Sequence, residues 1–285
     1  MSLATLHAPA PTVFTERFID LPTGVRLPWV EHGSALGIPV LLLHGWSDSW
    51  RSYQPLLPYL HPSHHAYALS LRGHGTATRP HSGYRPGDFV ADVAAFMDAM
   101  GIEAAVIVAH SMGTTIAQRF ALDYPDRVLG LALLGAIHTW RHIGGLQELQ
   151  AAVTNLRDPV DPAFVREFQL STITQPVPPA LVEMVVRESL RLPARVWQEV
   201  MNGFIDDDSS EHIEAISAPT LIIWGDQDSV SPRGEQDDLL ARIPNARLIV
   251  YAGTGHAVHW EQPQRAAIDL VDFIDLIEFI NTLSH

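Results

Sequence analysis

The sequence predicts an α/β fold in which a mostly parallel central sheet is flanked by helices. Short apolar runs that suit strands buried on both faces alternate with amphipathic helical segments along most of the chain. Polar or glycine-rich residues follow several of these runs, at the strand ends where functional loops of parallel sheets lie. The alternation stops after Gly135 and returns after Pro219, with only helical segments in between. The chain is therefore expected to combine one α/β core with an inserted helical part.

The first elements are expected to be an arm, a hairpin and a central strand. Residues through Pro11 are rich in alanine and proline, which favours a loose arm. The predicted strands Glu16–Asp20 and Val25–Glu31 flank a Leu-Pro-Thr-Gly turn signal. The aliphatic run Val40–Leu43 then predicts a buried parallel strand, which ends where the loop at His44 begins.

The next elements continue the alternation. Apolar residues of Ser49–Leu60 recur at helical spacing and predict a helix, in which Pro55 and Pro58 blur the boundaries. The elements expected after it are a strand His65–Leu71, a helix Pro86–Met100, a strand Ala104–Val108, a helix with Met112, Ile116 and Phe120 on one face, and a strand Val128–Leu134.

Residues 138–213 are expected to form a helical cap on a core domain made of residues 1–137 and 214–285. No run of the earlier strand type occurs in the cap segment, which proline residues punctuate. Its candidate helices are Leu146–Leu156, Pro162–Leu170, Pro179–Leu192 and Arg195–Ile205. The core then resumes with a strand Thr220–Trp224, a helix near Glu235–Ala241, a strand Arg247–Tyr251 and a last helix Pro263–Leu283.

Composition excludes several classes of chemistry. The 285 residues carry a net charge of −14, and all 18 basic residues are arginine, because the chain has no lysine. This excludes a phosphate-binding lysine of the Walker type and a lysine Schiff base, and the acidity argues against a nucleic-acid partner. The absence of cysteine excludes disulfides, thiolate zinc sites and a cysteine nucleophile. His138 and His142 have helical spacing but no accompanying H-E-x-x-H acid, so neither a metal nor a cofactor is expected.

The ends of the chain bear on its location and assembly. The N-terminus has no basic start and no sustained apolar segment, and no apolar run is long enough to cross a bilayer. A cytoplasmic protein without a membrane partner is therefore expected. The last helix carries Asp269, Asp272, Asp275 and Glu278 on one stripe, which predicts a solvated acidic edge or, alternatively, part of a dimer interface. Both a monomer and a homodimer stay open.

Ser111 lies at the junction between a predicted strand and a predicted helix. In so tight a strand–turn–helix the serine adopts a strained backbone conformation, which exposes its hydroxyl above the sheet. The first N–H groups of the helix point at the same place and would stabilise an anion there. The segment Ala109-His110-Ser111-Met112-Gly113 matches the nucleophile-elbow pattern G-x-S-x-G, except that alanine replaces the first glycine.

The chain also supplies an acid and a base after two later strands. Asp228 follows the strand that ends at Trp224, and His256 follows the strand that ends at Tyr251. A serine hydroxyl needs a base to take its proton, and that base works best when a carboxylate fixes its tautomer. The chain order Ser, Asp, His is the order that belongs to this elbow.

With LLLHGW, RGHG, AHSMG, WGDQD and GHAVHWEQP in register, the chain resembles the α/β-hydrolase fold family from about residue 16 to its end. The resemblance implies that Ser111 is the nucleophile, His256 the general base and acid, and Asp228 the orienting carboxylate. Asp226 is the neighbouring candidate for the carboxylate, but in similar sequences the later aspartate of this turn serves the triad, which leaves Asp226 to brace the turn. The other position that the family uses for the acid holds Gly135 in this chain.

The fold usually forms its oxyanion hole from two backbone N–H groups, which correspond here to those of Trp46 and Met112. His44 is expected to hold the early loop rather than to act in catalysis, and His259 to lie at the surface or behind the site. Aromatic residues expected either to line the pocket or to pack inside the cap are Trp140, Trp197, Phe204 and Trp260.

A serine nucleophile predicts attack on a carbonyl group, through an acyl-enzyme that water hydrolyses. The first hypothesis is therefore an ester or lactone hydrolase acting on a small molecule with an apolar portion. HGWSDSWRSY is similar to the early loop of haloalkane dehalogenases and epoxide hydrolases, but those enzymes place an aspartate at the elbow. Cofactor-free dioxygenases, perhydrolases and C–C bond hydrolases of similar sequence stay open, although the Gly-Pro-Gly loop of the last group is absent. A hydrolase-like ligand receptor is the alternative of another class.

Overall fold

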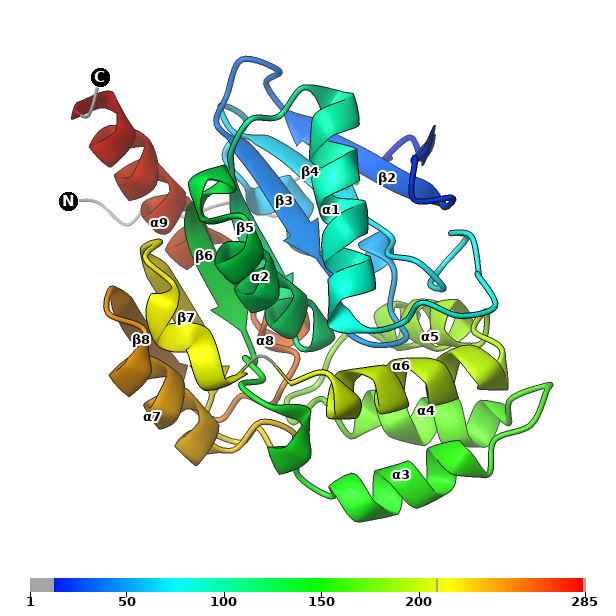
Figure 1. Cartoon of the computed structure of the whole chain (residues 1–285). Helices are drawn as coiled ribbons and strands as arrows, with labels where there is room; N and C mark the ends of the chain where they lie inside the picture. Colours follow the sequence, from blue (N-terminus) through cyan, green and yellow to red (C-terminus); the bar gives the residue numbers. More distant parts are fainter. Residues whose placement is uncertain (1–12, 209, 284–285) are drawn as a thin grey trace.

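An eight-stranded sheet forms the centre of the structure, which is a computed structural model that describes residues 13–208 and 210–283 (Figure 1). The strand order is β1-β2-β4-β3-β5-β6-β7-β8; β2 runs antiparallel to both of its neighbours, and every other pair is parallel. The predicted mostly parallel sheet is thus confirmed, whereas the arm expected through Pro11 lies outside the described residues. The strands are β1 Arg17–Asp20, β2 Arg26–Gly33, β3 Pro39–Leu43, β4 His65–Leu69, β5 Ala105–His110, β6 Val128–Leu134, β7 Thr220–Gly225 and β8 Ala246–Tyr251.

Helices cover both faces of the sheet because its strands are apolar on both sides. Alternate residues of β3 enter different cores: Leu41 and Leu43 belong to one cluster, Val40 and Leu42 to the other. The first cluster is covered by α1 (Pro86–Met100), α2 (Met112–Asp123) and α7 (Arg233–Arg242), and the second by α9 (Pro263–Leu283). Figure 1 shows α1 and α2 in front of the sheet and α9 behind it.

The prediction of a helix over Ser49–Leu60 is wrong. The chain forms two short 3₁₀ turns there, Trp50–Tyr53 and Leu57–Tyr59. Pro55 and Pro58 lack the N–H that would continue a helical ladder, and each disfavours the α conformation in the residue before it. The apolar spacing that suggested a helix is still used, because Tyr53, Leu57 and their neighbours are buried in the second core cluster.

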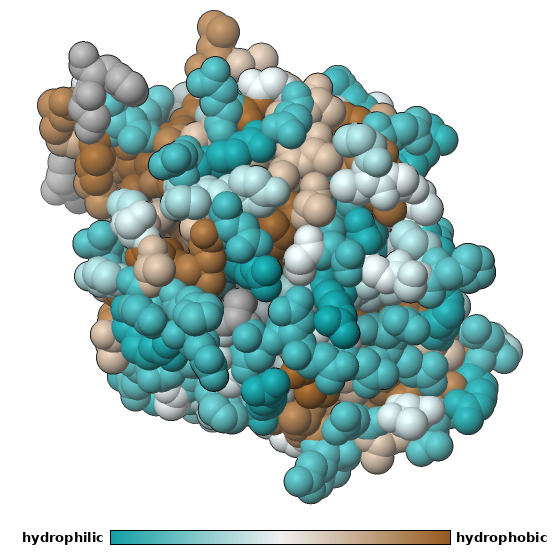
Figure 2. Space-filling view, in the orientation of Figure 1, coloured by the Kyte–Doolittle hydropathy of each residue, from teal (hydrophilic) through white to brown (hydrophobic). Residues whose placement is uncertain are grey.

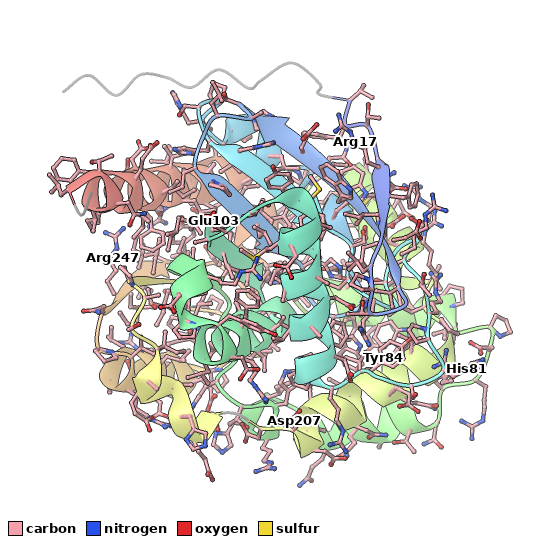
Figure 3. The ribbon with its side chains drawn as sticks, turned by 45° about the horizontal axis from the view of Figure 1, so that its top comes forward. Arg17, His81, Tyr84, Glu103, Asp207 and Arg247 are labelled. Atoms are coloured by element: carbon pink, nitrogen blue, oxygen red, sulfur yellow. The ribbon has the colours of Figure 1, made fainter. Side chains whose placement is uncertain are left out.

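Four helices lie between β6 and β7, as the sequence predicts, and we call them the helical insertion: α3 Leu146–Thr154, α4 Pro162–Leu170, α5 Pro179–Ser189 and α6 Ala194–Asp206. They lie across the carboxyl ends of the parallel strands (Figure 1). Asp207 accepts a hydrogen bond of 3.4 Å from Arg119 of α2, and Arg195 donates to the carbonyl of His81 at 3.0 Å. Figure 3 shows Asp207 at one end of α6 and His81 near its other end.

The last two helices differ in how far the sequence predicted them. The short α8 (Val258–Glu261) was not expected, whereas α9 has its predicted bounds. The acidic residues Asp272, Asp275 and Glu278 are exposed, as a solvated edge requires. Figure 2 shows apolar side chains over the C-terminal part of α9, where Phe279 is 61% exposed. Among the described helices, none combines the length and the apolar character needed to cross a membrane.

Candidate active site

Ser111 occupies the sharp turn between β5 and α2. Its φ of 51° and ψ of −121° lie outside the regions that non-glycine residues favour. Its N–H donates to the carbonyl of Leu134 on the neighbouring strand at 3.1 Å, which fixes the turn. A Cβ atom at Gly113 would lie 2.3 Å from the carbonyl oxygen of Leu43. Glycine is therefore required at the last position of the motif, because α2 approaches β3 too closely for a side chain.

Ala109, which replaces the first glycine of the motif, is fully buried. Its methyl group belongs to the same core cluster as Ile107 and Leu133. It lies on β5 before the turn, paired with Leu43 on one side and Leu133 on the other. The extra methyl group is thus part of the packed core and leaves the turn at Ser111 intact.

The structure brings His256 and Asp228 together from the ends of β8 and β7. Nδ1 of His256 lies 2.8 Å from Oδ2 of Asp228, and both side chains are almost fully buried. The other carboxylate oxygen accepts the backbone N–H groups of Val230 and Ser231, both at 2.9 Å. Because the carboxylate accepts from Nδ1–H, the second ring nitrogen, Nε2, carries a lone pair in the neutral imidazole. Nε2 is buried and has no hydrogen-bond partner in the described part of the chain.

Two neighbours explain why Asp228 is the carboxylate that reaches His256. Asp226 turns towards the loop after β8, where its Oδ1 accepts the N–H of Gly253 at 2.6 Å, so it braces the turn. Gly135, at the end of β6, has a φ of 53°, and a Cβ there would lie 2.9 Å from Nδ1 of His256. Gly135 therefore has no room for an acidic side chain, because the imidazole of His256 occupies the space that a Cβ atom would need.

The loop after β3 approaches the same place. His44 accepts the N–H of Leu71 at Nε2 (2.9 Å) and donates from Nδ1 to the carbonyl of Gly45 (2.7 Å), so it ties this loop to the end of β4. Burial, together with nearby His74, holds the pKa of His44 well below its ordinary value. The neutral ring is a structural link, as the sequence indicated. Trp46 follows in this loop and lines the same cavity as Ser111.

Ser47 is, with Ser111, one of two non-glycine residues with positive φ in the described chain, at 66°. Both lie in loops at the cavity, where backbone strain commonly accompanies function. No described group accepts a hydrogen bond from the backbone N–H of Trp46 or of Met112. These two donors are free for an incoming group.

A cavity of about 220 Å³ opens between these loops and the helical insertion, and Ser111 and His256 line it. Most of its wall is apolar, and the residues that form this part are Trp46, Ile137, Trp140, Ile143, Leu149, Phe168, Val230 and Trp260. Of the four aromatic residues expected either to line the pocket or to pack inside the cap, Trp140 and Trp260 line it. Trp197 and Phe204 do not, and are buried within the insertion's contact with the core.

The sequence did not indicate a buried polar cluster beside the cavity, made of Asp48, Ser52, His110 and His259. Ser52 donates to Oδ2 of Asp48 at 3.1 Å and lies 3.0 Å from Nε2 of His259. Nε2 of His110 lies 3.3 Å from the carbonyl oxygen of His256. His259 is fully buried, so the expectation of a surface position is wrong and its place behind the site is right. An acidic residue between the tryptophans of the loop after β3 is the signal that could have found this cluster.

Burial decides the protonation of the polar cluster. It raises the pKa of Asp48 to about 7, against the opposing hydrogen bonds from Ser52 and Gln169. It lowers the pKa of His259 to about 3, and that of His110 well below the ordinary value, with nearby histidines adding to both effects. At mildly acidic pH, below the pKa of Asp48 and above those of the two histidines, the cluster is therefore neutral.

The histidine pair His138 and His142 contacts carboxylates of α7. Nδ1 of His138 lies 2.9 Å from Asp238, and Nδ1 of His142 lies 2.8 Å from Glu235. Within the described residues, one group of three possible ligands, His64, Asp275 and Glu278, has its ligating atoms within 4.8 Å of one another. It lies at the start of β4, at the opposite edge of the sheet from Ser111, and the sequence did not indicate it.

Comparison with known proteins identifies the family. The family model of the alpha/beta hydrolase fold matches residues 38–157 and 177–263. The chain is 27% identical over 275 residues to a non-heme haloperoxidase of Rhodococcus erythropolis, covering 90% of this chain and 99% of the relative. It is 28% identical over 264 residues to a 2-hydroxy-6-oxo-2,4-heptadienoate hydrolase of Pseudomonas putida, covering 85% of this chain and 91% of the relative.

A similar solved structure is an esterase from Exiguobacterium antarcticum. It superposes with a TM-score of 0.82 at 21% identity, over 92% of this chain and all of the esterase chain. This similarity, at 21% identity, concerns the fold alone. Together with the family model, which covers more than half of the residues, it leads to one conclusion: the chain belongs to the α/β-hydrolase fold family of enzymes.

Proposed function

We propose that this protein is a serine hydrolase that cleaves a carboxylic ester or lactone through an acyl-enzyme intermediate. The observation that carries the proposal is the bond of 2.8 Å between His256 and Asp228, with the second nitrogen of His256 free in the cavity that Ser111 lines. A serine hydroxyl beside such a base can be deprotonated as it attacks a carbonyl carbon. The similarity to a relative named as a hydrolase supports hydrolysis as the reaction class.

The proposed cycle uses each of these groups in turn. Ser111 Oγ forms a bond to the carbonyl carbon while its proton passes to Nε2 of His256, and Asp228 stabilises the imidazolium. The oxyanion accepts the backbone N–H groups of Trp46 and Met112, which form the proposed oxyanion hole. Collapse of the tetrahedral intermediate expels the alkoxide, which takes the proton from His256. Water then attacks the acyl-enzyme by the same route and releases a carboxylate.

The cavity suggests a small substrate with an apolar acyl group. Its volume of about 220 Å³ exceeds the roughly 150 Å³ of an apolar cavity that holds benzene. The wall is mostly aromatic and aliphatic, so an aryl or short alkyl group fits it better than a charged one. The helical insertion closes the cavity and serves as the proposed cap, which screens the acyl-enzyme from bulk water.

The test is hydrolysis of p-nitrophenyl acetate, butyrate and benzoate. We expect Ser111→Ala to lower kcat/KM at least about a thousandfold, because it removes the attacking oxygen. The control is Ser82→Ala, which changes an exposed serine and should leave kcat/KM unchanged. A p-nitrophenyl phosphonate should add one phosphonyl group to Ser111, detected by mass spectrometry. Equal ester hydrolysis by wild type and Ser111→Ala would contradict the proposal.

Perhydrolysis is a second candidate, which the similarity to a non-heme haloperoxidase favours. Hydrogen peroxide would replace water in the attack on the acyl-enzyme, giving a peracid and free Ser111. Acetate buffer supplies the acyl group, and added bromide is oxidised by the peracid to hypobromite, so bromination of monochlorodimedone would detect the peracid. The signal should vanish in Ser111→Ala. Peroxide-dependent activity that survives this substitution would exclude the acyl-enzyme route.

A further inference from the structure

Asp48 places a carboxyl group in the wall of the catalytic cavity, and the proposed cycle does not use it. The residue is 3% exposed and lines the cavity together with Ser111. A Cβ atom added at Gly45 would lie 3.2 Å from Cβ of Ser111 and 3.3 Å from Oδ2 of Asp48, so both atoms border the same small space. A small molecule bound next to Ser111 would therefore also lie close to this carboxyl group.

The hydrogen-bond donors of Asp48 are neutral. Gln169 of α4 donates to Oδ1 at 3.2 Å, and Ser52 donates to Oδ2 at 3.1 Å. Among the described residues, His110 has the basic side chain that lies within 4.0 Å of the Asp48 carboxylate, with its Nδ1 4.0 Å from Oδ2. His110 gives its own proton to the carbonyl of His256 from Nε2, so Nδ1 carries a lone pair and offers no positive charge.

Other titratable groups face Asp48 from the surrounding elements. His256 attracts its charge, Glu188 of α5 repels it, and Tyr53 lies within electrostatic range. Glu188 is itself paired with Arg191 at 3.0 Å and with Arg51 at 3.8 Å. His259 contacts Asp48 only through Ser52. A charge on Asp48 is thus buried without a direct ion pair, which favours the neutral acid.

We infer that Asp48 is a specificity-determining residue of the catalytic cavity: as a neutral carboxyl group it allows anionic groups to bind there, and after losing its proton it repels them. The inference rests on the proposed function, because it assumes that Ser111 and His256 catalyse the reaction in this cavity. The burial that raises the pKa of Asp48 to about 7 places the change near neutral pH. The groups affected are the carboxylate product and the oxyanion of the tetrahedral intermediate.

The test is calorimetric titration with benzoate, which stays a carboxylate from about pH 5.5 to about pH 8.5. Asp48→Asn mimics the neutral acid: its amide can accept from Gln169 and donate to the Ser52 oxygen. We expect wild type and Asp48→Asn to bind benzoate equally at the acid end. At the alkaline end wild type should bind at least about tenfold more weakly than the variant. The two proteins differ only at residue 48, so the ratio of their affinities reports Asp48.

Two controls separate charge in the cavity from other causes. Asp237→Asn removes one exposed charge on α7 and should follow wild type at every pH. Benzamide, a neutral ligand of the same shape, should bind wild type with little dependence on pH. The inference is overturned if Asp48→Asn follows wild type, if benzamide weakens as benzoate does, or if neither protein binds benzoate in acid.

A second variant serves if Asp48→Asn does not fold. Ser52→Ala removes a hydrogen bond that favours the ionised carboxylate, so benzoate affinity should fall at a higher pH than in wild type. An unchanged midpoint would count against Asp48 as the titrating group. Absence of ester hydrolysis by wild type, with benzoate binding as described, would refute the proposed function and leave this inference standing.

Discussion

Gly135 shows how a single residue determines which acid serves the proposed triad. The end of β6 is close enough to His256 for a carboxylate, yet a Cβ at Gly135 would lie 2.8 Å from the backbone oxygen and 3.0 Å from Cε1 of that histidine. The imidazole therefore takes its partner from Asp228, at the end of β7. The sequence placed glycine at this position without showing that the histidine requires it.

We expect Gly135→Ala to lower kcat of ester hydrolysis about a hundredfold, because His256 must move to make room for the methyl group. Gly145→Ala is the matched control. Gly145 also has a positive φ, of 67°, but a Cβ there has nothing within 4 Å. Both variants should lose about 1 kcal/mol of stability from the strained backbone, measured by urea unfolding. Equal kcat values in the two variants would show that the contact with His256 is harmless.

At the scale of elements, α8 connects the catalytic loop to the helical insertion. Glu261, its last residue, accepts the N–H of Gly255 at 3.0 Å, of Gln175 at 2.8 Å and of Thr174 at 3.2 Å. One carboxylate thus holds the residue before His256 against the segment between α4 and α5. Short helices of this kind escape sequence analysis because four residues carry too little periodicity.

Glu261→Gln should separate these segments, because its amide group would face backbone N–H donors instead of accepting from them. We expect a loss of about 1–3 kcal/mol in the free energy of unfolding and a higher KM. Glu167→Gln changes an exposed glutamate of α4 and should be neutral in both measurements. Stability and KM like those of the control would mean that Glu261 does not hold the insertion in place.

At the scale of the whole molecule, the core contains several neutral histidines. His44, His74, His110 and His259 are buried, and burial lowers the pKa of all four, that of His74 to about 4. Unfolding returns the pKa of each histidine to its ordinary value of about 6.5. The unfolded chain therefore binds more protons than the native one as the pH falls below this value, and stability falls with it.

We expect the melting temperature to fall steeply from pH 7 to pH 5. Asp48 acts in the opposite sense: its pKa is raised to about 7, so the native state holds a proton that the unfolded state loses above pH 4. Four histidines against one carboxyl group give an uptake of about three protons on unfolding near pH 5, measurable by calorimetry in buffers of different ionisation enthalpy. His259→Gln should lower the uptake by about one, and exposed His212→Gln should not. A melting temperature that rises towards pH 5 would contradict this account.

The sequence by itself determined how strands and helices alternate along most of the chain, because hydrophobic period and strand length are local properties. It also placed Ser111, Asp228 and His256 at strand ends, which a parallel sheet collects at one edge, although their catalytic roles stay predictions. It failed at residues 49–60, where two prolines outweighed the periodicity.

Only the tertiary structure decided which side chains share the cavity. Asp48 and Gln169 meet across 121 positions of the chain, and Trp197 and Phe204 turn away from the space that Trp140 lines. It also decided which residues of the helical insertion, such as Leu149 and Phe168, line the cavity with Ser111. Burial and contact between distant segments set the protonation of Asp48 and of the four histidines, and no local pattern records either quantity. The elbow could be found in the sequence because it is local, whereas the surroundings that select its substrate exist only after folding.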